Sequence, residues 1–152
     1  MDHDHTFNLN RTAASATLHC LTGCAIGEVL GMIISSALGW AAAPSIALAV
    51  LLAFFFGYLL SLVPLVRYGL GWKKSLRIAF VADTASIAVM EITDNAVLLV
   101  IPGAIHADLT TFLFWGSLTF SLMVAFAVAF PLNRYLISRG KGHAVAHKYH
   151  HS

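Results

Sequence analysis

Residues 44–66 of the chain read PSIALAVLLAFFFGYLLSLVPLV, a stretch of 23 residues without a charged side chain. About 20 apolar residues are enough for a helix to cross the hydrocarbon core of a bilayer. The stretch lacks the alternation of a β-barrel strand, and in lipid a helix satisfies its own backbone hydrogen bonds. It therefore predicts a transmembrane helix.

Three more apolar stretches of similar length lie at residues 15–38, 78–101 and 109–132. Together the four stretches predict an all-α polytopic membrane protein with four transmembrane helices. We expect one domain over residues 1–152, with a polar segment at residues 1–14 and a tail at residues 139–152. The first stretch is too long for the apolar region of a signal peptide, about 7–15 residues, so we expect it to be retained.

The composition agrees with a membrane protein. Hydrophobic residues make up 59% of the chain and charged residues 11%, against about 25% charged residues in globular domains. The mean hydropathy is +0.79. These values disfavour a soluble enzyme, a nucleic-acid-binding protein and a secreted disulfide scaffold.

The positive residues predict the orientation. All nine Lys and Arg lie outside the four apolar stretches, and the loops at residues 39–43 and 102–108 carry none of them. Because cytoplasmic loops of membrane proteins are enriched in Lys and Arg, we expect both termini and the loop between the second and third stretches in the cytoplasm.

A short internal repeat relates residues 64–68, PLVRY, to residues 131–135, PLNRY. A duplicated helical hairpin would explain it, as in transporters whose repeats are related by an axis along the membrane normal. The preference of Pro and Arg-Tyr for the interfacial end of a helix explains it equally well. Both interpretations stay open.

Four of the seven acidic residues lie inside the apolar stretches, namely Glu28, Asp83, Glu91 and Asp94. An ionised carboxylate at the centre of a bilayer costs roughly 2.5–3.5 kcal/mol on the insertion scale. No Lys or Arg is present at the same depth to pair with them. We therefore expect these groups to be protonated, hydrogen-bonded in a wet cavity, or neutralised by a cation from outside the polypeptide.

Helical spacing gathers the polar residues of stretch 78–101 on one face. A narrow stripe holds Asp83, Ser86, Met90 and Asp94, Glu91 and Ile87 lie beside it, and Asn95 and Thr84 widen it. The opposite face is Ala, Val and Ile, which suits lipid or packing.

The first stretch has a polar face of its own, with His19, Cys20, Cys24 and Glu28 at steps of one and four residues. Gly23, Gly27 and Gly31 lie in the same arc. Small residues four apart allow a second helix to approach closely. If the two polar faces meet, His19, Cys20 and Asp83 form one layer, and Glu28 and Glu91 form another. The second and fourth stretches offer little beyond Ser and Thr and are expected to be scaffold.

The residue types on these faces suit a transition metal. Thiolate and imidazole bind Cu(I) and Zn, carboxylates bind harder ions, and Zn accepts all three. The alternative is that the two Cys are small core residues, because free Cys is commonly buried. Met90 is a possible soft ligand but is also a typical packing residue.

Other candidate ligands lie outside the apolar stretches. The tail carries His143, His147, His150 and His151, which share one face if the tail is helical. Short His-rich segments commonly bind metals, although a solvated tail explains them too. His106 and Asp108 in the loop could collect a cation or simply be solvated.

Two motifs resemble a known family. His-Cys-x-x-Gly-Cys occurs at residues 19–24 and Gly-Lys-Gly-His-Ala at residues 140–144, with Ala-Asp, Met-Glu and Asp-Asn pairs between them. The chain is similar to a bacterial family of small four-helix membrane proteins catalogued only as a domain of unknown function. The resemblance implies the fold and a bacterial inner membrane location, but no activity.

The leading hypothesis is a copper or zinc transport or channel protein. Four helices leave little room for a solvated path, so we expect a homo-oligomer. The alternatives are a membrane metal-binding or metal-delivery protein without transport, and a proton-coupled transporter of a small solute. We expect no enzyme, because no stretch combines a nucleophile, a base and an orienting group at a recognised spacing.

Overall fold

The fold is known from a computed structural model of the chain. The structure describes the backbone at residues 2–67, 69 and 71–138. Side chains are described within these ranges except at residues 2–8, 64, 65, 74, 75, 78, 79 and 82.

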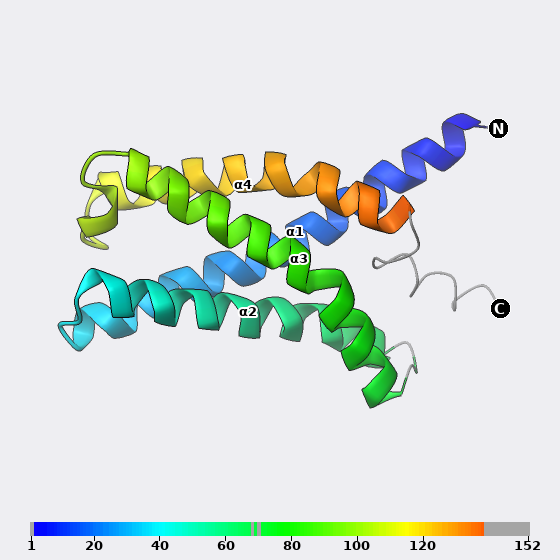
Figure 1. Cartoon of the computed structure of the whole chain (residues 1–152), viewed down its shortest axis with the longest axis horizontal. Coiled ribbons are helices and arrows are strands. Elements are labelled where there is room, and N and C mark those ends of the chain that lie inside the picture. Colours follow the sequence, from blue (N-terminus) through cyan, green and yellow to red (C-terminus); the bar gives the residue numbers. More distant parts are fainter. Residues whose placement is uncertain (1, 68, 70, 139–152) are drawn as a thin grey trace.

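The regular structure of the described chain is all helical and includes four long helices, as predicted (Figure 1). They are α1 (Asp2–Ala37), α2 (Ala42–Arg67), α3 (Trp72–Val100) and α4 (Phe112–Ser138), with a short 3₁₀ helix, η1 (Ala104–His106), before α4. Two boundaries differ from the sequence prediction. α1 begins at Asp2 rather than near residue 15, because no Gly or Pro interrupts residues 2–14. α4 continues past Pro131 to Ser138, where the prediction ended it at residue 132.

Three of the described helical segments are long and apolar enough to cross a membrane, at Leu9–Ala37, Ala42–Val63 and Phe112–Ser138. These segments support a membrane protein. α3 is 29 residues long but is not among them, because its acidic residues lower its hydropathy. The prediction of four helices is thus confirmed, and three of them have the character of spans.

In α3, too, large apolar side chains are exposed and polar side chains are buried. Ile92 and Leu99 of α3 are 71% and 67% exposed, whereas Asp83, Ser86 and Asp94 on its other face are buried. In water this arrangement would expose apolar surface and remove carboxyl groups from solvent, both at a cost in free energy. The pattern suits a helix whose outer face contacts lipid and whose inner face contacts other helices.

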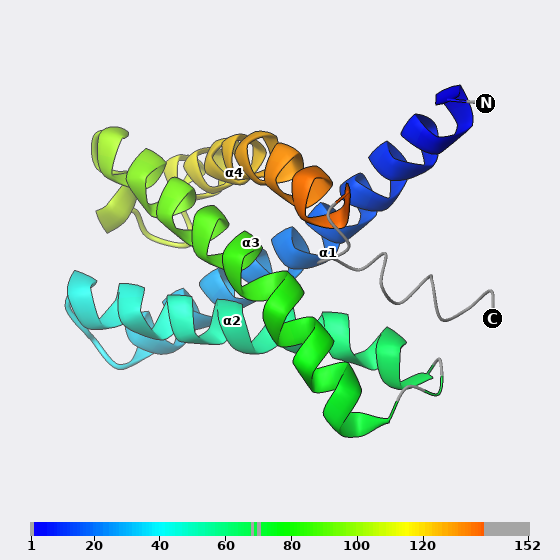
Figure 2. The ribbon, with the colours of Figure 1, turned by 45° about the vertical axis from the view of Figure 1, so that its right-hand side comes forward.

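The chain forms two helical hairpins, α1 with α2 and α3 with α4, and the connection within each hairpin lies at the same end of the molecule. The α1–α2 connection and the α3–α4 connection with η1 lie at one end, and the N-terminus and the α2–α3 connection lie at the other (Figures 1 and 2). Each described Lys and Arg side chain is exposed and belongs to the second end by its place in the helices: Arg11, Arg67, Lys73, Arg77 and Arg134. The positive charge of the described Lys and Arg side chains is thus concentrated at one end of the bundle.

The glycine stripe of α1 packs against α2 of the same chain. A Cβ added at Gly23 would lie 2.6 Å from the Cα of Gly57, and one added at Gly31 would lie 2.7 Å from the Cα of Ala49. Between them, a Cβ at Gly27 would collide with the backbone of Ala53. The stripe is therefore used inside the chain, and it gives no support to the predicted homo-oligomer.

Away from this seam, side chains join the hairpins. Ile87 of α3 packs on Gly57, where an added Cβ would lie 2.6 Å from the Ile87 Cδ1 atom. Near the charged end, Asn133 of α4 donates a hydrogen bond to the Thr17 hydroxyl of α1 at 2.9 Å, and both residues are buried. The Thr17 hydroxyl in turn donates to the carbonyl of Ala13.

We expect Thr17→Val to destabilise the protein by about 1 kcal/mol. Valine keeps the volume but removes the acceptor of the Asn133 amide, and leaving a buried donor unsatisfied is unfavourable even in a membrane protein. Thr22→Val is the matched control, since Thr22 makes the same bond to its own helix but is exposed. Thermal unfolding in detergent measures the difference, and equal Tm values for the two variants would contradict the role of the Asn133 contact.

Candidate functional site

A cavity of about 230 Å³ lies between the two hairpins at the end that carries the α1–α2 and α3–α4 connections. All four helices and η1 contribute to its wall. The exposed residues Trp40, His106 and Asp108 belong to the wall, so the cavity reaches the surface at that end. A buried water needs roughly 10–15 Å³ measured in this way, so the cavity has room for several water molecules.

Three buried carboxyl groups line this cavity, in addition to the exposed Asp108 at its mouth. Glu28 comes from α1, and Glu91 and Asp94 come from α3. They are only 7%, 4% and 2% exposed, respectively. None of their six oxygens has a hydrogen-bond partner among the residues that the structure describes. Buried polar groups in native proteins are nearly always satisfied, so these oxygens indicate a place for water, protons or a cation.

The three groups form one cluster. The Glu28 carboxyl is close enough to Asp94 and Glu91 to interact electrostatically with both. Ser121 of α4 lies beside Asp94 and is fully buried. The predicted layer of Glu28 and Glu91 is therefore present, with Asp94 as a third member.

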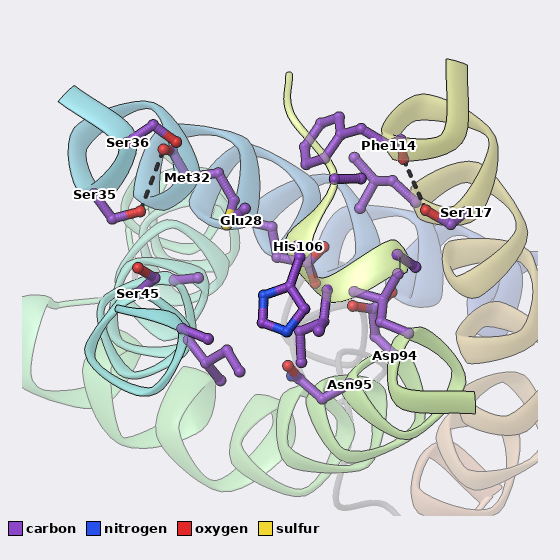
Figure 3. Close-up of a pocket in the computed structure, with 18 of the residues that line it drawn as sticks. Glu28, Met32, Ser35, Ser36, Ser45, Asp94, Asn95, His106, Phe114 and Ser117 are labelled. Atoms are coloured by element: carbon purple, nitrogen blue, oxygen red, sulfur yellow. Dashed lines mark hydrogen bonds between the residues drawn. The ribbon is translucent and has the colours of Figure 1, made fainter. Parts of the chain in front are cut away.

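Figure 3 shows residues that line the cavity. The imidazole of His106 points into the cavity, and Asp94 and Asn95 lie on one side of it, with Ser45 on another. Gly103 precedes η1 with φ +77°, a left-handed conformation that costs glycine little, and so lets the chain turn over the cavity. The Asn95 amide donates to the Glu91 carbonyl at 2.8 Å.

The two thiols lie deeper in the bundle. Cys20 and Cys24 are each 1% exposed, and both are free. The Cys20 thiol donates to Asp83 Oδ1 at 3.7 Å, and Cys24 lies beside Glu91. Both pack in the core with residues such as Met90, and none of these three belongs to the cavity wall.

Two comparisons return nothing, since no curated protein and no solved structure matches the chain. A family model does match, and it covers residues 9–142 under the description domain of unknown function, DUF4396. The chain belongs to this family. Membership in DUF4396 names no chemistry, so the function has to be argued from the residues of the site.

His19 does not join the layer predicted for it. It is exposed, and its ring Nδ1 lies 2.7 Å from the carbonyl of Ser15 on its own helix. Cys20 and Asp83 do meet, because the next position on α1 faces inward. The predicted layer of His19, Cys20 and Asp83 is therefore a pair rather than a triad.

Of the remaining predicted residues, some are described by the structure and others lie outside the described residues. Ser86 is buried on the inner face of α3, and Asp108 belongs to the cavity mouth. The tail histidines lie outside the described residues, namely His143, His147, His150 and His151. In the part of this DUF4396 chain that the structure describes, no group of three His, Cys, Asp or Glu side chains is arranged to hold a metal ion.

Sequence reasoning missed the contribution of the other two helices. Ser45 of α2 and Ser117 of α4 line the cavity together with Ser35 of α1, so three helices contribute serine hydroxyls to its wall. Ser121 reaches the carboxyl cluster. A signal was present, because serines at residues 117 and 121 are one helical turn apart in an otherwise apolar stretch.

Proposed function

We propose that the chain is a membrane transport or channel protein for a transition-metal cation, zinc or copper. The observation that carries the proposal is the cluster of Glu28, Glu91 and Asp94. These carboxyl groups line a cavity that reaches the surface, yet no described Lys or Arg side chain is buried beside them. Ionisable groups inside a membrane protein commonly mark the path of an ion or a proton.

The polar groups continue beyond the cavity. Glu91 lies beside Cys24, Cys24 is one turn from Cys20, and Cys20 contacts Asp83. Along the axis of the bundle, this series places oxygen donors next to the cavity and sulfur donors deeper. A cation that accepts both kinds of donor could move along it, and Zn²⁺ does so.

The proposed topology has four spans in a bacterial inner membrane, with both termini in the cytoplasm. The outward-facing apolar residues of α3 support its role as the fourth span. The exposed Lys and Arg at the end opposite the cavity support a cytoplasmic position of that end. The cavity then opens to the external side.

Transport is favoured over permanent metal binding. A storage or structural site needs a preformed set of ligands, usually four for zinc, and the described residues hold no group of three. A proton-coupled transporter of a small solute is the second candidate, because a cavity of about 230 Å³ is larger than a bare ion requires.

The proposal is tested with purified protein in liposomes that contain a metal-sensitive dye. We expect Zn²⁺ or copper flux well above that of protein-free liposomes. Cys24→Ala and Glu91→Ala should each lower this flux at least about tenfold, because loss of groups around a metal commonly lowers metal affinity or activity 10–100-fold. Ile92→Ala is the control, because Ile92 lies next to Glu91 in sequence but faces outward.

Two results would contradict transport. Stoichiometric binding of metal without flux would support a binding or delivery protein instead. Flux that is the same in the wild type, Cys24→Ala and Glu91→Ala would show that the carboxyl cluster and the thiols are not on the path.

A further inference from the structure

The wall of the cavity offers oxygen and nitrogen donors but no thiol. The cavity is lined by three buried carboxyl groups and the exposed one of Asp108, by the amide of Asn95, by the imidazole of His106 and by serine hydroxyls. Among the described residues of this wall, Met32 is the one that contains sulfur. A cation that arrives from the surface meets the oxygen donors first.

The thiols of Cys20 and Cys24 cannot contact a cation that has just entered the cavity. Cys20 and Cys24 pack against Ala53, Ile87 and Met90 in the core and are not part of the wall. A soft ion such as Cu(I), which prefers thiolate and thioether ligands, would find a single thioether. Carboxylate, amide and water suit divalent ions, and imidazole also suits Zn²⁺.

The dimensions of the cavity support the same class of ion. A cavity of about 230 Å³ exceeds the space of one bare ion and has room for several waters. Serine hydroxyls from three helices can hydrogen-bond those waters, and the unsatisfied carboxyl oxygens of Glu28 and Asp94 can balance a double positive charge.

We propose that the cavity is a binding site for a hydrated divalent transition-metal cation such as Zn²⁺, and that it selects against Cu(I). This inference rests on the proposed function and specifies the substrate of its first site. The ion keeps its water shell, the carboxyl groups of Glu28, Glu91 and Asp94 balance its charge, and the serine hydroxyls and Asn95 hydrogen-bond its waters. The thiols bind only after the ion has left the cavity.

Equilibrium binding and the coordination shell test the proposal without relying on transport. The full-length protein in detergent is titrated with Zn²⁺ alone and with chelator-buffered Cu(I) alone. We expect Zn²⁺ to bind at least tenfold more tightly than Cu(I), and Asp94→Asn to weaken Zn²⁺ binding at least tenfold. Met123→Leu, on the exposed face of α4, is the control for folding in detergent.

X-ray absorption of the protein with one equivalent of Zn²⁺ gives the donor type directly. We expect only oxygen or nitrogen neighbours, at about 2.0–2.2 Å. A zinc–sulfur shell near 2.3 Å, tighter binding of Cu(I), or displacement of Zn²⁺ by an equal concentration of methylammonium would each overturn the inference. Zn²⁺ bound through oxygen or nitrogen but not transported would refute the transport function and leave the site standing.

Discussion

Replacing Glu28 with Gln and Asp94 with Asn in the same chain should reduce metal flux at least about 100-fold. The two carboxyl groups lie beside each other in the wall of the cavity, one from each hairpin. Amides of the same shape cannot balance a divalent cation. Mutating a group that only supports a metal ligand commonly lowers metal affinity or activity 10–100-fold, and on the proposed function the loss of both charges should lower flux at least as much. Flux into dye-loaded liposomes measures the effect.

The same double variant should be at least as stable as the wild type. The carboxyl oxygens of Glu28 and Asp94 make no hydrogen bond with a described residue, so neutral amides lose little on folding. Asp108→Asn is the matched control at the exposed mouth, where we expect a much smaller change in flux. A drop in Tm together with the loss of flux would point to a structural role of these carboxyl groups and contradict the proposed path.

Gly27→Leu should destabilise the protein by about 3 kcal/mol or prevent folding. A Cβ at Gly27 would collide with the backbone nitrogen and Cα of Ala53, which cannot move aside as a flexible side chain can. Overpacking of a well-packed core typically costs 1–3 kcal/mol, and a clash with backbone lies at the upper end of this range. The free energy of unfolding in mixed detergent micelles measures the effect.

Gly116→Leu provides the control on α4. A Cβ at Gly116 meets no atom within 4 Å, so leucine there has open space. It should be neutral or stabilising, because glycine is a poor helix former by about 1 kcal/mol relative to alanine. Equal stability of the Gly27 and Gly116 variants would show that α1 and α2 are not in backbone contact at this position.

The helices were predictable because long apolar stretches leave the backbone few alternatives in lipid. Residues 44–66 correspond closely to α2 (Ala42–Arg67), and the glycine spacing correctly indicated a close helix contact. The partner of that contact was not predictable, because small residues at a spacing of four fit a helix of the same chain or of another chain equally well. The start of α1 was missed because hydropathy does not report helical structure outside the membrane.

The contacts within the site were predictable where they depend on the face of the helix that a residue occupies and on its position along the helix. Cys20 meets Asp83, and Glu28 meets Glu91, because both pairs lie at matched depth on inward faces. His19 was placed wrongly, because a shift of one position, about 100° around the helix, turns it outward. The cavity itself depends on how four helices diverge at one end, and no spacing within a single helix contains that information.

The contact at Gly27 also limits how the molecule can change shape. With backbone directly against backbone, no layer of flexible side chains separates α1 from α2, so sliding of one past the other would meet steep repulsion. The two helices should therefore move together as one rigid body. Glu28 belongs to this rigid pair of helices, while Glu91 and Asp94 belong to the other hairpin. Rocking of one hairpin against the other would thus separate the carboxyl group of Glu28 from those of Glu91 and Asp94, and would weaken the binding of the proposed cation between them.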